Sequence, residues 1–144
     1  MKYRQGAFGR VFLVKFDDQD DLLQGLKNIA ISENIRIGTI TLLGGLRAAG
    51  VVSGPRLPVI PPDPLWFDFN DGREVLGIGT LLWKSGEPVI HLHGAIGRDQ
   101  QTVAGCIRKD SSVYLIIEAV IAEIVGIEAA RALNEKTGLV MLEL

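Results

Sequence analysis

The sequence is poor in the side chains that bind soft transition metals: its 144 residues include only two histidines and one cysteine. All three lie close together in the chain, at His91, His93 and Cys106. A single cysteine cannot form an intramolecular disulfide, which favours a reducing compartment. The N-terminal residues also lack the long apolar core of a signal peptide, so we expect a cytoplasmic protein.

Long apolar runs and an excess of basic charge are missing as well. The longest apolar stretch, residues 113–125, is interrupted by Glu118 and Glu123, and a membrane span takes about 18 apolar residues or more. The net charge is −2 and the pI is about 5.7, whereas a domain that binds nucleic-acid phosphates typically has a pI above about 9. We therefore expect no membrane-spanning segment and no direct nucleic-acid binding.

Apolar residues, by contrast, are abundant. They make up 47% of the chain, and the mean hydropathy of +0.26 is high for a small soluble domain. Such a composition indicates strands buried on both faces, or a surface that packs against another subunit. The length is that of one domain, which we place at residues 1–144.

The hydrophobic pattern predicts an α+β fold with a mixed, mainly antiparallel β-sheet. Apolar residues at helical spacing over residues 22–33, after aspartates that can cap a helix, predict one N-terminal amphipathic helix. A second, short C-terminal helix is predicted over residues 127–135. Five prolines in residues 55–64 predict an extended surface loop. Strands are predicted at residues 10–16, 37–53, 65–69, 74–83, 89–96, 102–107, 113–125 and 139–144.

The strand pattern brings the three candidate metal ligands together. In a strand, residues two apart such as His91 and His93 project to the same face. A hairpin loop at residues 98–101 places His93 opposite Cys106, and directly opposed Cβ atoms are about 5 Å apart. Imidazole and thiolate are preferred zinc ligands, and a three-ligand set leaves one coordination position open. A shift of one residue in register would move Cys106 to the other face and remove the site.

Each of these residues also has a simpler interpretation. A His-x-His pair is often a hydrogen-bonded surface pair, and a lone cysteine is often a small buried apolar residue. We interpret Trp66 and Trp83 as core or interface aromatics rather than ligand-stacking residues.

Several short motifs are spread along the chain: Gly-Gly-Leu-Arg at 44–47, Gly-Arg-Glu-Val-Leu at 72–76, His-Leu-His-Gly-Ala-Ile-Gly at 91–97, Val-Ala-Gly-Cys-Ile at 103–107 and Thr-Gly-Leu at 137–139. With these motifs the sequence resembles the PPC domain (plant and prokaryote conserved domain, also called DUF296) over nearly its whole length. Prokaryotic members typically have Gly-Gly-His where this chain has Ala104-Gly105-Cys106. The resemblance thus implies a zinc site at His91, His93 and Cys106, and cysteine is a competent ligand as the thiolate.

The resemblance also carries expectations about fold and assembly. It implies a stand-alone prokaryotic PPC-like domain with an antiparallel sheet, and a homotrimer, which would account for the high apolar fraction. Plant members join the domain to DNA-binding AT-hook segments, and bacterial members are often labelled DNA-binding by that association. No AT-hook occurs in this sequence, so its link to DNA or transcription rests on the family label alone.

Three functions are therefore open. The first is a small trimeric domain that binds a metal or another ligand, with regulatory or unknown biochemistry and an unidentified small-molecule ligand. The second is a zinc-dependent enzyme, in which the metal lowers the pKa of a bound water towards 7 and a carboxylate acts as general base. The third is a transcriptional module that works through partners.

The candidate general bases are Glu74, Glu87 and Glu118. Glu118 is favoured because it interrupts an apolar run and would be costly to bury without a partner. Its simpler interpretation is a carboxylate at a strand edge or subunit interface.

Overall fold

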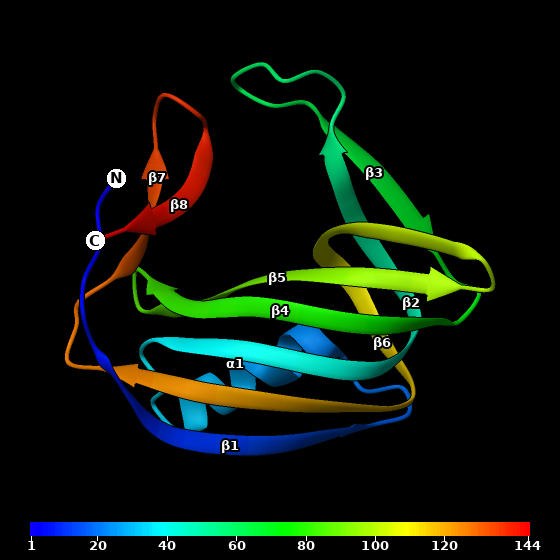
Figure 1. The fold of residues 1–144 in the computed structure, drawn as a ribbon, viewed down its shortest axis with the longest axis horizontal. Helices are drawn as coiled ribbons and strands as arrows, with labels where there is room; N and C mark the ends of the chain where they lie inside the picture. Colours follow the sequence, from blue (N-terminus) through cyan, green and yellow to red (C-terminus); the bar gives the residue numbers. More distant parts are fainter.

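A computed structural model describes residues 1–144, and its main feature is a strongly curled antiparallel β-sheet (Figure 1). Its strands follow the order β1-β6-β5-β4-β2-β3, and a further β6–β2 pairing closes a ring of four strands. Every strand pair is antiparallel, so the mainly antiparallel sheet is confirmed and its expected mixed character is not found. The six strands are β1 (Ala7–Asp17), β2 (Gly38–Pro55), β3 (Pro64–Phe69), β4 (Arg73–Lys84), β5 (Glu87–Arg98) and β6 (Gln101–Val125).

The ring closes because β2 and β6 bend. Gly44 in β2 has φ +137°, and a Cβ there would clash with the backbone carbonyl oxygen of Ile116 in β6, so the bend needs glycine. In β6, Asp110 and Leu115 have positive φ, at 53° and 64°. The first half of this 25-residue strand pairs with β5 and its second half with β1. One bent strand thus replaces the two separate strands predicted over residues 102–125.

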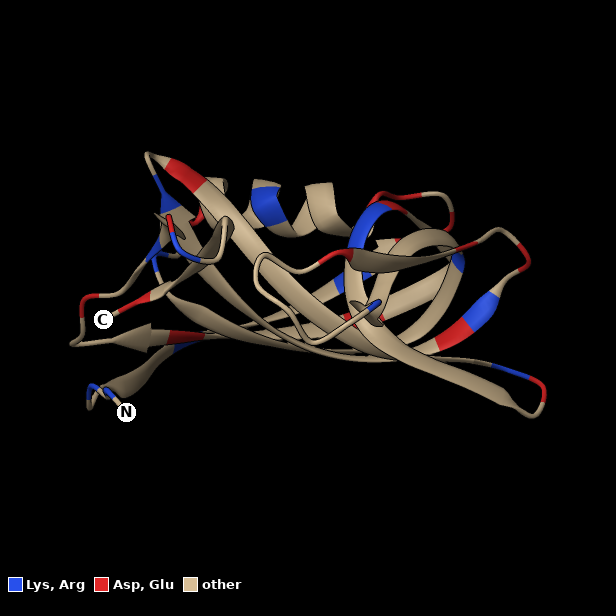
Figure 2. Cartoon of the chain, turned by 90° about the horizontal axis from the view of Figure 1, so that it is seen from above, with Lys and Arg blue, Asp and Glu red and all other residues tan.

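One face of the sheet, here called the inner face, is covered by α1 (Leu22–Ser32), the only helix (Figure 2). The Asp21 carboxylate accepts a hydrogen bond from the backbone N–H of Gln24 at 3.0 Å. This bond caps the helix, as we predicted from the aspartates that precede it. The N-terminal amphipathic helix is therefore confirmed. Its buried side chains join a core of 20 residues that includes Leu22, Leu26, Ile40, Leu46, Leu92, Ile96, Ile117 and Ile121. The structure contains no helix with the length and hydropathy needed to cross a bilayer.

The C-terminal segment forms a β-hairpin, so the short helix predicted over residues 127–135 is wrong. β7 (Ala130–Asn134) pairs with β8 (Leu139–Glu143). The Asn134 side chain accepts hydrogen bonds from the backbone N–H groups of the next turn, and Gly138 has φ +68°. Asparagine and glycine at these positions favour a tight turn, which overrides the moderate helix propensity of the preceding residues.

Two projections rise from the opposite face of the sheet, here called the outer face (Figure 1). One is the β7–β8 hairpin, tied to β4 by a hydrogen bond from Arg131 Nη2 to Thr80 Oγ1 at 2.9 Å. The other is the arm made by the end of β2 and by β3, which pair with each other. The proline-rich loop, residues 56–63, joins these strands and is mostly exposed, which confirms the predicted surface loop. It is bent and not extended, because the backbone N–H of Arg56 donates to the carbonyl of Asp63 and that of Val59 to the carbonyl of Leu57. The two projections stand toward opposite ends of β5.

Candidate metal centre

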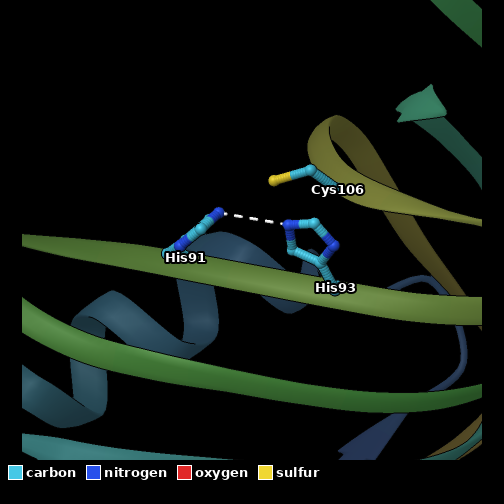
Figure 3. Close-up of side chains that lie close together, drawn as sticks. All are labelled: His91, His93 and Cys106. Carbon is cyan, nitrogen blue, oxygen red and sulfur yellow. Dashed lines mark hydrogen bonds between the residues drawn. The ribbon is translucent and has the colours of Figure 1, made fainter. Parts of the chain in front are cut away.

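His91, His93 and Cys106 lie together on the outer face of the sheet, as Figure 3 shows. The histidines project from β5 and the cysteine from the adjacent part of β6. The register pairs His93 with Cys106, the pairing that the hairpin argument predicted. The turn is tighter than expected, because Arg98 still pairs with Gln101, but the register is the same.

The ligand atoms of the three side chains have a spacing that fits zinc. The two Nε2 atoms are 3.2 Å apart, close to the separation of about 3.3 Å that tetrahedral zinc gives with Zn–N bonds of 2.0–2.1 Å. All three ligand atoms lie within 4.8 Å of one another, which is at most about 1.2 Å beyond the separation of about 3.6 Å between nitrogen and sulfur ligands of tetrahedral zinc. The donor set and its spacing therefore suit a three-ligand zinc site.

The histidine pair also fits the simpler interpretation. An Nε2–Nε2 distance of 3.2 Å allows one imidazole to donate a hydrogen bond to the other when their tautomers differ. The rings meet edge to face, with centroids 5.0 Å apart. A hydrogen bond between the histidines does not explain why Cys106 lies beside them, whereas a metal site involves all three residues.

Cys106 is held between two strands. It pairs with His93 of β5 on one side and with Val52 of β2 on the other, and it is only 4% exposed. The close crossing depends on Gly105, where a Cβ would lie 2.6 Å from the carbonyl oxygen of Val52. The small residue before Cys106 thus has a direct role in placing the thiol.

Burial shifts the pKa values of two side chains of the cluster, Cys106 and His91. Burial raises the pKa of the Cys106 thiol, while the positive charges of Arg108 and Arg131 act in the opposite direction. Burial also lowers the pKa of His91, and Arg131 adds to this effect. Metals bind neutral imidazole and thiolate. His91 is therefore in its ligating form at neutral pH, whereas Cys106 would release a proton on binding a metal.

Two arginines that the sequence interpretation did not single out border the cluster. Arg108 follows Cys106 by two residues in β6, a spacing that places both on one face and could have indicated it. Arg131 comes from β7 and donates to Thr80, which is paired with His91. It is the only buried charged residue of the chain, at 9% exposed. No local pattern marks Arg131, because it reaches the site through the C-terminal hairpin.

The candidate general bases do not reach the cluster. Glu118 is exposed and pairs with Lys15 of β1 and Leu43 of β2, so β2 and β4 separate it from β5 across the sheet. Glu74 and Glu87 are also exposed, toward opposite ends of the β4–β5 pair. The metal-binding group contains no carboxylate. The burial that favoured Glu118 is absent in the structure.

A cavity of about 440 Å³ adjoins the cluster. His93, Cys106 and Arg108 form its polar side, and the two projections supply its apolar walls: Val52, Pro55, Pro62, Pro64, Trp66 and Leu139. Trp66 is thus a wall of this cavity, 45% exposed, and not a core residue. Trp83, by contrast, packs against the core, and its indole N–H donates to the carbonyl of Ile35 at 2.7 Å.

Fold and site together define a small domain with a closed antiparallel sheet, one covering helix and a three-ligand cluster on the uncovered face. The model of the Plants and Prokaryotes Conserved (PCC) domain family matches residues 3–125, and the chain belongs to this family. This confirms the resemblance seen in the sequence motifs. No curated protein matches the sequence.

Solved structures share the fold. A metal-containing protein from Archaeoglobus fulgidus matches with a TM-score of 0.87 and 21% identity, over 100% of both chains. A plant- and prokaryote-conserved (PPC) protein from Pyrococcus horikoshii matches with a TM-score of 0.85 and 23% identity, over 100% of this chain and 98% of the other. A protein from Ralstonia eutropha, described as a "putative DNA-binding protein", matches with a TM-score of 0.76 and 19% identity, over 92% of this chain and 90% of the other. At these identities the likeness shows the fold alone.

Proposed function

We propose that this protein is a trimeric zinc-binding domain of a reducing, cytoplasmic compartment, with His91, His93 and Cys106 as the zinc ligands. The observation that carries the proposal is the convergence of all histidines and the only cysteine of the chain on one point of the outer face. The fold shared with the metal-containing protein from Archaeoglobus fulgidus supports it.

The donor set favours zinc over other biological cations. Magnesium and calcium prefer oxygen ligands, and the cluster offers none. Two imidazoles and one thiolate suit a borderline-soft ion such as zinc. When bound, zinc would supply a positively charged centre with one coordination position left for water or a further ligand.

The metal content of the protein, purified without a histidine tag, tests this proposal. We expect near-stoichiometric zinc in the unmodified chain and a loss of zinc in His93→Ala and in Cys106→Ala. Gln100→Ala, at the exposed tip of the same hairpin, is the matched control and should keep its zinc. A tag-free protein that holds no metal after incubation with zinc would contradict the proposal.

The trimer is proposed from the apolar side chains of the outer face. Several large apolar side chains there are exposed to solvent: Leu13 at 81%, Leu43 at 53%, Leu76 at 67%, Ile78 at 64% and Val120 at 38%. Exposed apolar side chains gathered on one face in this way mark an interface. We infer that copies of this chain cover it, in line with the trimer that the family resemblance implies.

Light scattering on the purified protein tests the assembly. We expect a mass of three chains for the unmodified protein and a smaller mass for Leu43→Glu. Ile31→Glu, at an exposed position of α1, is the control and should stay trimeric. A monomeric unmodified protein would overturn this part of the proposal.

A zinc-dependent enzyme is the second candidate, and the cavity beside the open coordination position favours it. The structure offers no carboxylate near the cluster, so Glu118 has no support as general base. Hydrolysis of an activated ester by the zinc-loaded protein tests this candidate. A binding domain should show no turnover above that of Cys106→Ala, whereas an enzyme should lose its turnover with the metal.

If the protein has a role in transcription, we propose that it acts by binding other proteins and not by contacting DNA. Basic and acidic residues are interspersed along the chain (Figure 2), and seven of the cationic side chains sit in ion pairs with carboxylates. A gel-shift assay at about 150 mM salt should be blank, because the chain carries a net charge of −2, whereas binding to a phosphate backbone depends on an excess of basic charge. A sequence-specific shift would contradict this expectation.

A further inference from the structure

We propose that the metal centre receives a carboxylate carried on an apolar or aromatic body, with Arg131 and Arg108 beside the carboxylate and the adjoining cavity around the body. This inference rests on the zinc site proposed above and names the class of ligand that the site takes.

The first observation is the state of Arg131. It is only 9% exposed, and its one hydrogen bond goes to the neutral hydroxyl of Thr80. Its Nε atom is buried without any hydrogen-bond partner. A buried guanidinium without a carboxylate is unfavourable, so the position of Arg131 is explained best by an anion that the protein binds from solution.

The second observation is the charge around the cluster. Bound zinc would carry two positive charges, and the Cys106 thiolate would offset one of them. Arg131 and Arg108 add two more, and neither forms a salt bridge. The zinc-loaded centre would therefore carry a net positive charge, which an added anion would offset.

The third observation is the shape and chemistry of the cavity. Its volume of about 440 Å³ is within the range of about 300–1,000 Å³ found for small-molecule sites. Prolines and Trp66 form much of its wall, and Arg108 is its only charged side chain. An inorganic anion such as phosphate would leave these apolar walls unused. A carboxylate on an aromatic or aliphatic body would contact both Arg108 and the apolar walls, and the unpaired charge of Arg131 would add to the attraction.

Calorimetric titration of the zinc-loaded protein with four probes tests the ligand class. Phenylacetate has both the carboxylate and the body, acetate and phosphate have only the anion, and 2-phenylethanol has only the body. We expect phenylacetate to bind at least tenfold more tightly than each of the other three. Equal binding of phenylacetate and acetate would contradict the role of the cavity, and equal binding of phenylacetate and 2-phenylethanol would contradict the role of the arginines.

Two variants test the arginines directly, each titrated after its zinc loading has been measured. Arg131→Met keeps the length of the side chain without its charge, and we expect it to weaken phenylacetate binding at least tenfold. Arg108→Met, at an exposed position, gives an independent result if Arg131→Met does not fold. Arg36→Met, at an exposed position where the guanidinium stacks on Trp83, is the control and should bind phenylacetate as the unmodified protein does.

The outcomes separate this inference from the proposed function. A protein that holds zinc and binds phenylacetate no better than acetate overturns the inference and leaves the zinc site standing. A protein that holds no zinc overturns both. Unchanged phenylacetate binding in Arg131→Met and Arg108→Met also overturns the inference.

Discussion

The two faces of the sheet are built from similar residues but have different surroundings. On the inner face, leucines and isoleucines are fully buried beneath α1. On the outer face, side chains of the same kinds are exposed, and the only histidines and cysteine of the chain lie on the same face. The inner face therefore accounts for the stability of the fold, and the outer face is where binding and assembly are expected.

The pairing of the strands connects the apolar side chains of the outer face to the His91, His93 and Cys106 cluster. Along one row across the sheet, Leu13 pairs with Val120, Thr41 lies between Val120 and Ile78, and Ile78 pairs with His93. Because these residues share a face, an interface on the apolar side chains would lie beside the cluster. The proposed subunit interface and the proposed metal site are thus neighbours on one surface.

The largest expected difference between the faces is in the free energy of unfolding. Leu26→Ala, under the helix, should lower it by about 2–5 kcal/mol, because the deletion leaves a cavity in a packed core. Leu13→Ala, on the outer face, should lower it by less than about 1 kcal/mol at low protein concentration. At higher concentration the loss should be larger, because the unmodified chain is then stabilised by association and the variant associates less. Urea unfolding at several concentrations measures both. Equal losses in the two variants at low concentration would remove the distinction between the faces.

The next effect concerns Cys106, which belongs to the outer face but is buried between β5 and β2. In Gly105→Ala the new methyl group would press on Val51 and Val52, which should cost about 1–3 kcal/mol of unfolding free energy and also weaken zinc binding by moving Cys106. Gly97→Ala, in the same hairpin, has more room, with 3.3 Å to the nearest atom, and is the control. Zinc affinity that survives in Gly105→Ala would show that the position of Cys106 does not depend on this crossing.

Zinc affinity should depend on pH, because the cluster contains titratable ligands whereas the apolar side chains of the outer face do not titrate. Burial raises the pKa of the Cys106 thiol, so binding near neutral pH displaces one proton and affinity should rise about tenfold per pH unit, or about 1.4 kcal/mol. The rise should end where pH reaches the pKa of that thiol. Burial also lowers the pKa of His91, so competition from protonation of this imidazole begins only at lower pH than usual. Competition titrations with a chelator measure the slope, and a flat profile from pH 7 to pH 8 would exclude Cys106 as a ligand.

The smallest expected effect is that of Arg131 on the stability of the metal-free protein. Arg131→Met removes a buried charge without a carboxylate partner, together with one hydrogen bond to Thr80. We expect the free energy of unfolding to change by less than about 1 kcal/mol or to increase. A loss of about 3 kcal/mol or more would show that Arg131 serves the fold and not a ligand.

The parts of the fold that the sequence predicted depend on local patterns. The β5–β6 register follows from the turn near residues 98–101 and the alternation on either side of it, and it brought His93 opposite Cys106. The helix follows from its aspartate cap and the spacing of Leu22, Leu26 and Ala30. In both cases short-range spacing carries the information.

The parts that the sequence did not predict depend on contacts between distant segments. The C-terminal hairpin is held to the sheet by Arg131 and Thr80, which are 51 residues apart. The closure of the ring needs the matched bends of β2 and β6. The cavity combines walls from β2, β3 and β8 with the cluster. No local periodicity encodes such contacts, and for this reason Arg131 was missed.

Cobalt substitution tests the central claim most directly, because the visible spectrum of Co(II) reports both coordination geometry and thiolate ligation. We predict that one equivalent of Co(II) gives the intense bands of a tetrahedral site together with a sulfur-to-cobalt charge-transfer band. The charge-transfer band should disappear in Cys106→Ala and persist in Gln100→Ala. A spectrum of hexaaqua cobalt in the unmodified protein, or a charge-transfer band that survives in Cys106→Ala, would contradict the assignment of His91, His93 and Cys106 as a metal centre.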